Sequence, residues 1–194
     1  MMTSGEHGFS MIEVLISVFV LTAGVIGGAG MQLTALRTAQ QSALQTRALY
    51  LASDMADMMR ANGAQMQRGD SENPYLQVDH KVSTTPHRLS DYSCYDADAH
   101  CDAEQLARFD IAQLLQQLDA DFPGGRVRIC RDALPWNAVA GRFAWECTAT
   151  ASSAASAPVV IKIGWQEKDR TGNALEDAAA AAPGMVLTVA GYAK

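Results

Sequence analysis

A single uninterrupted apolar segment near the amino terminus constrains this chain more than any other feature. No charged residue occurs between residues 14 and 36, and the polar side chains there are only Ser17, Thr22, Gln32 and Thr34. A helix rises about 1.5 Å per residue, so this stretch is long enough to cross a hydrocarbon core of about 30 Å. Read alone, the segment predicts a membrane anchor.

The residues at the start of the segment distinguish it from an ordinary anchor. Residues 1–8 are too few and too polar to contain the apolar region of a secretory signal, and no small-residue cleavage site follows the apolar run. Glu13 places one carboxylate near the start of the apolar run, at a cost of about 2.5 kcal/mol or more near a bilayer centre. A cationic partner would offset that cost, because it supplies both charge and hydrogen bonds.

The junction Gly8-Phe9, with Glu13 as the fifth residue after the glycine, resembles the signature of type IV pilins and pseudopilins. The resemblance implies that a prepilin peptidase in the membrane cleaves after Gly8 and methylates the new amino terminus at Phe9. It also implies that Glu13 docks against the terminal amine of a neighbouring subunit in a fibre. The leader departs from the family pattern because it contains no Lys or Arg, whose excess orients membrane segments.

The resemblance divides the chain into four parts. It implies a leader peptide (1–8), a transmembrane or fibre-core half of the first helix (9–36), an amphipathic half (37–62) and a periplasmic globular head with disulfides (63–194). The implied location is the bacterial inner membrane, crossed once, and then the pilus at the cell surface. The implied partners are the prepilin peptidase, the major pilin and other minor pilins.

Within this family, residues 54–62 and several shorter stretches before them resemble a minor pilin of the type IV pilus. Such a subunit takes part in priming pilus assembly and enters the pilus, at or near its tip. Two alternatives remain open at this point: a minor pseudopilin of a type II secretion system, and an adhesive binding module carried on a pilin stem. An exposed apolar or aromatic patch on the head would support the adhesive module.

Apolar periodicity predicts two helices. The first continues from about residue 10 to residue 62, where Asn62-Gly63 is expected to end it in a left-handed conformation. Its second half carries an apolar stripe for packing on the head, formed by Leu44, Ala48, Leu51, Met55 and Met58. The second helix begins after Asp102, with Gln105 completing a capping box, and ends at residues 123–125. Its expected buried face is Ala107, Ile111, Leu114, Leu115, Leu118 and Phe122.

The remainder of the chain predicts an antiparallel sheet of about four strands. The expected strands are residues 126–130, 143–147, 159–165 and 185–192, which alternate or are bounded by turn residues. The polar region 64–102 is expected to be a loop with a short strand at 76–82, and a helical turn is possible at 176–182. The amphipathic half of the first helix would cover the apolar face of the sheet. The fold class is therefore α+β and pilin-like.

Four cysteines lie outside the apolar segment, at Cys94, Cys101, Cys130 and Cys147. In an exported head they should form disulfides. Four cysteines allow three pairings, and nearness along the chain favours Cys94 with Cys101 and Cys130 with Cys147. The spacings lack the close Cys-x-x-Cys pairs of structural zinc sites, so disulfides are preferred to a metal.

Composition and motifs argue against several other functions. The formal net charge is −6 and there is no basic cluster, so nucleic-acid binding is not expected. His80, His87 and His100 do not form a hydrolase or zincin pattern. An acidic loop around Asp96, Asp98 and Asp102 lacks the glycine and terminal glutamate of a calcium loop. We therefore expect no enzyme activity, no cofactor and no metal.

Overall fold

The computed structural model describes residues 10–82, 94–95, 98–148, 157–166 and 182–189. It consists of two compact units, residues 1–43 and residues 44–194. The cleavage site predicted at Gly8 and Phe9 and most of the helical turn expected at 176–182 lie outside the described residues.

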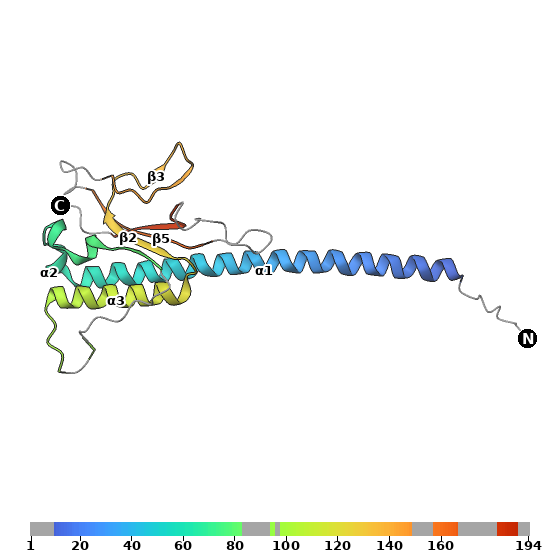
Figure 1. The fold of residues 1–194 in the computed structure, drawn as a ribbon, viewed down its shortest axis with the longest axis horizontal. Helices are drawn as coiled ribbons and strands as arrows, with labels where there is room; N and C mark the ends of the chain where they lie inside the picture. The colour runs from blue at the N-terminus through green and yellow to red at the C-terminus, as the bar shows by residue number, and fades with distance from the viewer. Residues whose placement is uncertain (1–9, 83–93, 96–97, 149–156, 167–181, 190–194) are drawn as a thin grey trace, which may run out of the picture. The chain divides into compact units, whose positions relative to one another are not determined.

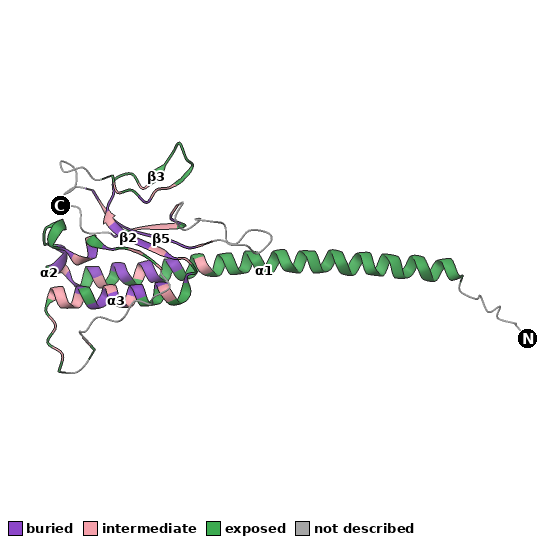
Figure 2. Ribbon diagram, in the orientation of Figure 1, coloured by how far each residue is buried: buried purple, intermediate pink, exposed green. Residues whose placement is uncertain are grey.

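The first unit consists of the amino-terminal part of helix α1 (Met11–Ala61). Every described residue from 10 to 43 is exposed, as the green colour of this part of α1 shows in Figure 2. The helix has the bounds expected from its periodicity, to within one residue at each end.

The second half of α1 belongs to the head and is amphipathic. Its buried residues are Ala48, Leu51, Ala52, Met55, Ala56 and Met59. Of the stripe predicted from the sequence, Ala48, Leu51 and Met55 are buried, whereas its two end members, Leu44 and Met58, are only half-buried. Met59, the neighbour of Met58, is fully buried. Small alanines on this face allow other elements to approach the helix closely, and the methionines fill the spaces left between them.

Helix α1 does not end in a left-handed residue, contrary to expectation. Asn62 has a φ of −92°, and Gly63 begins a second short helix, α2 (Gly63–Met66). The chain then forms two 3₁₀ turns, η1 (Asp70–Glu72) and η2 (Pro74–Gln77), so region 64–102 contains more helix than its turn-rich composition suggests. Strand β1 (Asp79–Lys81) confirms the short strand expected there, although it is only three residues long.

Helix α3 (Ala103–Asp121) starts as predicted. The side chain of Asp102 accepts from the backbone N–H of Gln105 at 2.8 Å, and the Gln105 side chain accepts from the N–H of Asp102 at 3.0 Å. This reciprocal pair satisfies two backbone donors that a helix otherwise leaves open. The predicted buried face is confirmed except at Ile111, which is half-buried.

The main sheet is antiparallel, with the strand order β1-β2-β5-β6. Strands β2 (Arg126–Arg131), β5 (Val159–Gly164) and β6 (Met185–Val189) confirm three of the predicted strands. The fourth prediction, residues 143–147, was wrong: β1 takes the place beside β2, so β2 has a partner on both sides. Residues 142–143 instead form β4 (Arg142–Phe143) in a small separate hairpin with β3 (Trp136–Asn137).

The head packs its core around the second half of α1. In Figure 1 this half of α1 lies between the sheet and α3. The core combines side chains from all three layers, among them Met55 and Met59 of α1, Leu118 of α3 and Ile161 of β5. Strand β5 is buried along its whole length and is one of the two inner strands of the sheet, between β2 and β6.

Candidate assembly interface and the head that carries it

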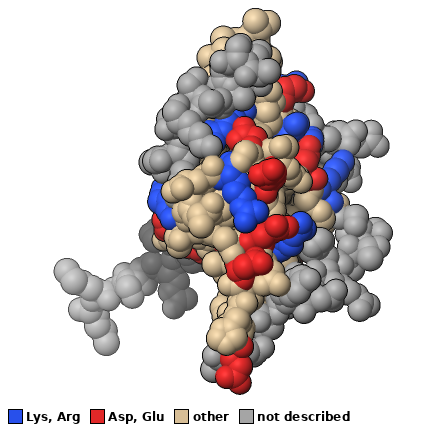
Figure 3. All heavy atoms as spheres, turned by 90° about the vertical axis from the view of Figure 1, so that its left-hand side faces the viewer, with Lys and Arg blue, Asp and Glu red and all other residues tan. Residues whose placement is uncertain are grey.

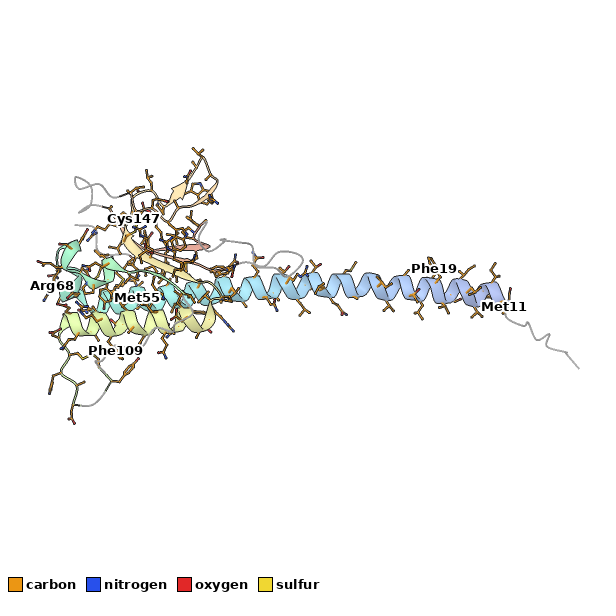
Figure 4. All side chains as sticks on the ribbon, viewed as in Figure 1. Met11, Phe19, Met55, Arg68, Phe109 and Cys147 are labelled. Carbon is orange, nitrogen blue, oxygen red and sulfur yellow. A yellow bond between two sulfur atoms is a disulfide. The ribbon has the colours of Figure 1, made fainter. Side chains whose placement is uncertain are left out.

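Large apolar side chains cover the first unit of α1 and remain exposed. They include Phe19, 73% exposed, which projects from the helix in Figure 4. The others in this segment are Met11, Ile12, Val14, Leu15, Ile16, Val18, Val20, Leu21, Val25, Ile26, Met31, Leu33 and Leu36. The helix is long and apolar enough to cross a membrane. An apolar surface of this extent requires lipid or other polypeptides to cover it.

Four hydroxyl side chains of α1 donate hydrogen bonds to backbone carbonyls of the same helix. Ser17 donates to the carbonyl of Glu13 at 2.7 Å, and Thr22 donates to the carbonyl of Phe19 at 2.8 Å. Thr34 and Thr38 make the same kind of bond, each to the carbonyl four residues earlier, at 3.1 Å. These residues therefore carry no unsatisfied hydroxyl donor into an apolar environment, where such a donor would be costly.

No close packing within the chain requires the glycines of this segment. A Cβ atom added at Gly24, Gly27, Gly28 or Gly30 would meet no other atom within 4 Å. Gly27 and Gly30 lie in a shallow groove along one side of the helix, which is lined further by Met31, Thr34, Ala35, Thr38, Ala39 and Ser42. Small side chains of this kind let a neighbouring helix approach closely.

Glu13 lies in the first turn of α1 and is exposed. A carboxylate at this position interacts favourably with the positive end of the helix dipole, by about 0.3–1 kcal/mol. That contribution does not need a neighbouring subunit. The residues from which an amine partner would come, Phe9 above all, lie outside the described part of the chain.

Two disulfides tie together parts of the head. Cys94 is bonded to Cys101, just before α3, and Cys130 of β2 is bonded to Cys147, which Figure 4 labels. Both bonds join cysteines that are neighbours along the chain. The second bond closes a loop that contains the β3–β4 hairpin.

A buried ion pair holds the same loop against the sheet. Lys162 of β5 donates to the Asp132 carboxylate at 2.5 Å and to the carbonyls of Ala144 and Glu146 at 2.8 and 2.7 Å, and both charged side chains are fully buried. Burial alone would raise the pKa of Asp132. The hydrogen bonds from Lys162, Thr148 and the Leu134 N–H outweigh it and lower the pKa below its usual value. Sequence alternation gave no signal for this pair.

A second buried polar cluster joins three helical elements. The Tyr75 hydroxyl of η2 donates to the Asp110 carboxylate of α3 at 2.5 Å. At the end of α1, Asn62 donates to the Tyr75 hydroxyl at 3.3 Å and to the carbonyl of Ala103 at 2.7 Å. Burial raises the pKa of Asp110, and the bond from Tyr75 opposes that shift only in part.

Charges on the head are mixed in sign. Figure 3 shows Lys and Arg side chains interspersed with Asp and Glu on one face. Several of these charges form exposed pairs, such as Arg108 with Glu104 at 2.8 Å and Arg126 with Asp79 at 2.9 Å. Exposed pairs contribute little to stability, but they leave no large field of one sign on this face.

The described members of the histidines and of the acidic loop singled out in the sequence form no metal-binding group. His80 lies 3.1 Å from a carboxylate oxygen of Asp119. Within the described ranges, no group of three or more His, Cys, Asp or Glu side chains could hold a metal ion. His87 and Asp96 lie outside those ranges.

These features define an α+β protein in which the first part of α1 is an exposed apolar segment and the second part belongs to a disulfide-bonded sheet domain, as in a pilin. A comparison with protein families agrees with that class. Residues 30–112 match the Tt1218-like family, described as type IV pilin Tt1218. No curated protein and no solved structure gives a significant match. The family match supports a structural pilin subunit, a class of protein that assembles with other pilins.

Proposed function

We propose that this chain is a minor pilin of a type IV pilus. In this proposal it is held in the inner membrane by its apolar segment and later enters the pilus, where the same segment packs among the helices of other subunits. The observation that carries the proposal is the exposed apolar part of α1, because its surface needs a covering that the chain itself does not provide.

Three details of this segment suit both environments. Its hydroxyls are already bonded, so they tolerate lipid and a protein core equally. Its glycines leave room along one side for a neighbouring helix. Its one carboxylate, Glu13, lies at the end where the amine of a processed neighbour would be available.

The assignment as a minor pilin, rather than the major one, rests on the resemblance of a few short stretches. Residues 28–32, 48–52 and 54–62 resemble PilV, the type IV pilus modification protein. Minor pilins of that kind take part in priming assembly and lie at or near the pilus tip, and we extend both properties to this chain. Cleavage between Gly8 and Phe9, methylation of Phe9, and docking through Glu13 belong to the same proposal.

The proposal is tested by finding the mature chain in the fibre. Pili sheared from cells that express the full-length protein should contain it in a small amount relative to the major pilin. Mass spectrometry of the protein from that fraction should give methylated Phe9 as its first residue. A Gly8→Leu variant should stay full-length in the inner membrane and be absent from sheared pili.

Two results would contradict the proposal. One is a mature terminus at any position other than Phe9. The other is a protein that is processed normally yet is found only in the inner membrane of piliated cells, which is the behaviour expected of a secretion pseudopilin.

A further inference from the structure

The β3–β4 hairpin exposes apolar side chains that the head does not use. Leu134 is 70% exposed, Trp136 is 52% exposed and Val139 is completely exposed. None of the three belongs to the buried core. An isolated exposed Leu is ordinary, but three large exposed apolar side chains within six residues, one just before the hairpin and two on it, call for an explanation.

The hairpin is rigid despite its exposure. The Asn137 side-chain oxygen accepts from the backbone N–H groups of Val139 and Ala140 at 3.0 and 2.9 Å, and Gly141 supplies the positive φ of +62° that the turn requires. Across the two strands the Trp136 and Phe143 rings pack edge to face, with their centroids 5.2 Å apart. A preordered surface loses little entropy when it binds.

The base of the hairpin is fixed more firmly than a surface loop requires. The Cys130–Cys147 disulfide closes it, and the buried Lys162–Asp132 pair holds both of its ends against β5. The exposed side chains of the hairpin add nothing to the core. The disulfide and the buried ion pair nevertheless hold the base of the hairpin, and so these side chains, in a fixed position.

We propose that the β3–β4 hairpin docks onto the head of another pilin subunit, at an apolar surface that carries a carboxylate. This inference rests on the proposed function. Arg142 is the only charged residue among residues 133–145, and no ion pair of the described residues includes it. Aromatic residues and Arg are the types enriched in protein interfaces.

The chemistry of the hairpin favours a protein over a sugar or a membrane. The patch also meets the condition stated above for an adhesive module, but a sugar site needs several polar side chains beside its aromatic ring, and the Asn137 oxygen is already used within the turn. The hairpin then offers a sugar mainly Arg142, which pairs with Asn137 across the strands. Binding to an anionic membrane relies on clusters of basic residues, whereas this hairpin has one. A subunit with an acidic balance like that of this chain, net charge −6, would offer Arg142 a carboxylate, and no ion pair among the described residues already occupies that side chain.

The test places a photoreactive amino acid, p-benzoylphenylalanine, at one position at a time in the full-length chain, in cells that assemble the pilus. Val139 reports on the hairpin. Gln116, exposed on α3, is the matched control on the head, and Ile26, 73% exposed in the apolar segment, reports on assembly itself. Crosslinked products are identified by mass spectrometry.

We expect Val139 to crosslink to the head of another pilin subunit, with a yield about tenfold above that of Gln116. Crosslinks from Ile26 to pilins without any from Val139 would overturn the hairpin inference and leave the proposed function standing. Crosslinks from Val139 to lipid or glycan would overturn it as well, in favour of another class of partner. Absence of pilin crosslinks from both positions would refute the proposed function and this inference with it.

Two substitutions add a second measurement. Trp136→Ala and Val139→Asp alter exposed side chains, so both variants should fold and form their disulfides. Each should reduce the amount of protein retained in sheared pili by about tenfold, as expected when an interface loses its main anchor. Gln116→Asp should leave that amount unchanged. Wild-type retention of both hairpin variants would contradict the proposal.

Discussion

Glu13 separates a fibre subunit from a simple anchored protein. If the carboxylate is only tolerated near the membrane surface, Glu13→Val should improve partition into lipid by about 2.5 kcal/mol and leave function intact. If it docks against the amine of Phe9 on a neighbour, the same change leaves that amine unpaired in an apolar core, at a cost of about 3–5 kcal/mol. We expect Glu13→Val to be processed and inserted normally but depleted from sheared pili, as measured by immunoblot. Normal incorporation would rule out the docking role.

Removing the buried charge of Asp110 should stabilise the head, whereas removing the charge of Glu13 should weaken assembly. Its pKa is raised by burial, so the folded head binds more protons than the unfolded chain and loses stability as the pH rises through the raised value. Asp110→Asn keeps an oxygen that can accept from Tyr75 and removes the desolvated charge. The variant should therefore be more stable than the wild-type protein at pH 7, with the difference shrinking toward pH 3 in urea titrations. A less stable variant at pH 7 would contradict this account.

The burial of a single residue could be predicted where it follows from the helical repeat of the sequence. Ala48 and Leu118 follow the helical period and are fully buried. The period does not decide between neighbours such as Met58 and Met59, because adjacent positions near the edge of the stripe differ in burial only through tertiary packing. Lys162 and Asp110 could not be predicted as buried, because their burial depends on partners far away in the sequence.

The loop between β2 and β5 depends on the Lys162–Asp132 pair. Lys162→Met would leave the Asp132 carboxylate buried without its cation, which typically costs about 3–5 kcal/mol of unfolding free energy. Lys81→Met, at an exposed lysine on β1, is the control and should change stability by less than about 0.5 kcal/mol. Denaturant unfolding of the full-length protein in detergent measures both. Equal stabilities for the two variants would show that the pair is not important.

The same pair should make this loop sensitive to acid. Because the pKa of Asp132 is lowered in the folded head, its contribution is present above the ordinary carboxyl pKa and is lost as the pH falls through the lower folded value.

The disulfide beneath the hairpin predicts a measurable loss when it is removed. Its cysteines are 17 residues apart, and a loop of that size is worth about 3 kcal/mol in the chain-entropy model. Replacing both Cys130 and Cys147 by Ser should lower the unfolding free energy by about that amount. Replacing Cys94 and Cys101, 7 residues apart, should cost slightly less, about 2.5 kcal/mol. Unchanged stability of the first variant would contradict the model.

Helices and strands whose bounds are set by residues close together in the sequence were predicted well. Strands whose place depends on which segments compete for an edge of the sheet were not. The capping box at Asp102 fixes the start of α3 by contacts three residues apart. Residues 143–147 carry a strand-like alternation, but β1 and β5 occupy both edges of β2, so no pairing position remains beside β2. The Trp145 side chain instead packs closely over Gly164, where an added Cβ would lie 2.8 Å from the ring.

The glycines of the first unit allow a test of whether this part of α1 packs against neighbouring subunits. Gly27→Leu should strengthen the helix by about 1 kcal/mol and leave the head unchanged, since no atom of the chain occupies the space beside it. In a fibre, the added side chain would fill the groove intended for a neighbour. We expect normal membrane insertion and fewer subunits in sheared pili, whereas Val25→Leu, outside that groove, should behave like the wild-type protein. Unimpaired incorporation of Gly27→Leu would show that the groove is not a packing surface.

The hydroxyl bonds within α1 have a consequence for the energetics of leaving the membrane. Because Ser17, Thr22, Thr34 and Thr38 bond to their own helix, extraction breaks none of these bonds and insertion forms none. For these four hydroxyls, transfer between lipid tails and a bundle of similar helices therefore costs little free energy. If the chain enters a pilus as proposed, these hydroxyls oppose neither the exit of the segment from the bilayer nor its return.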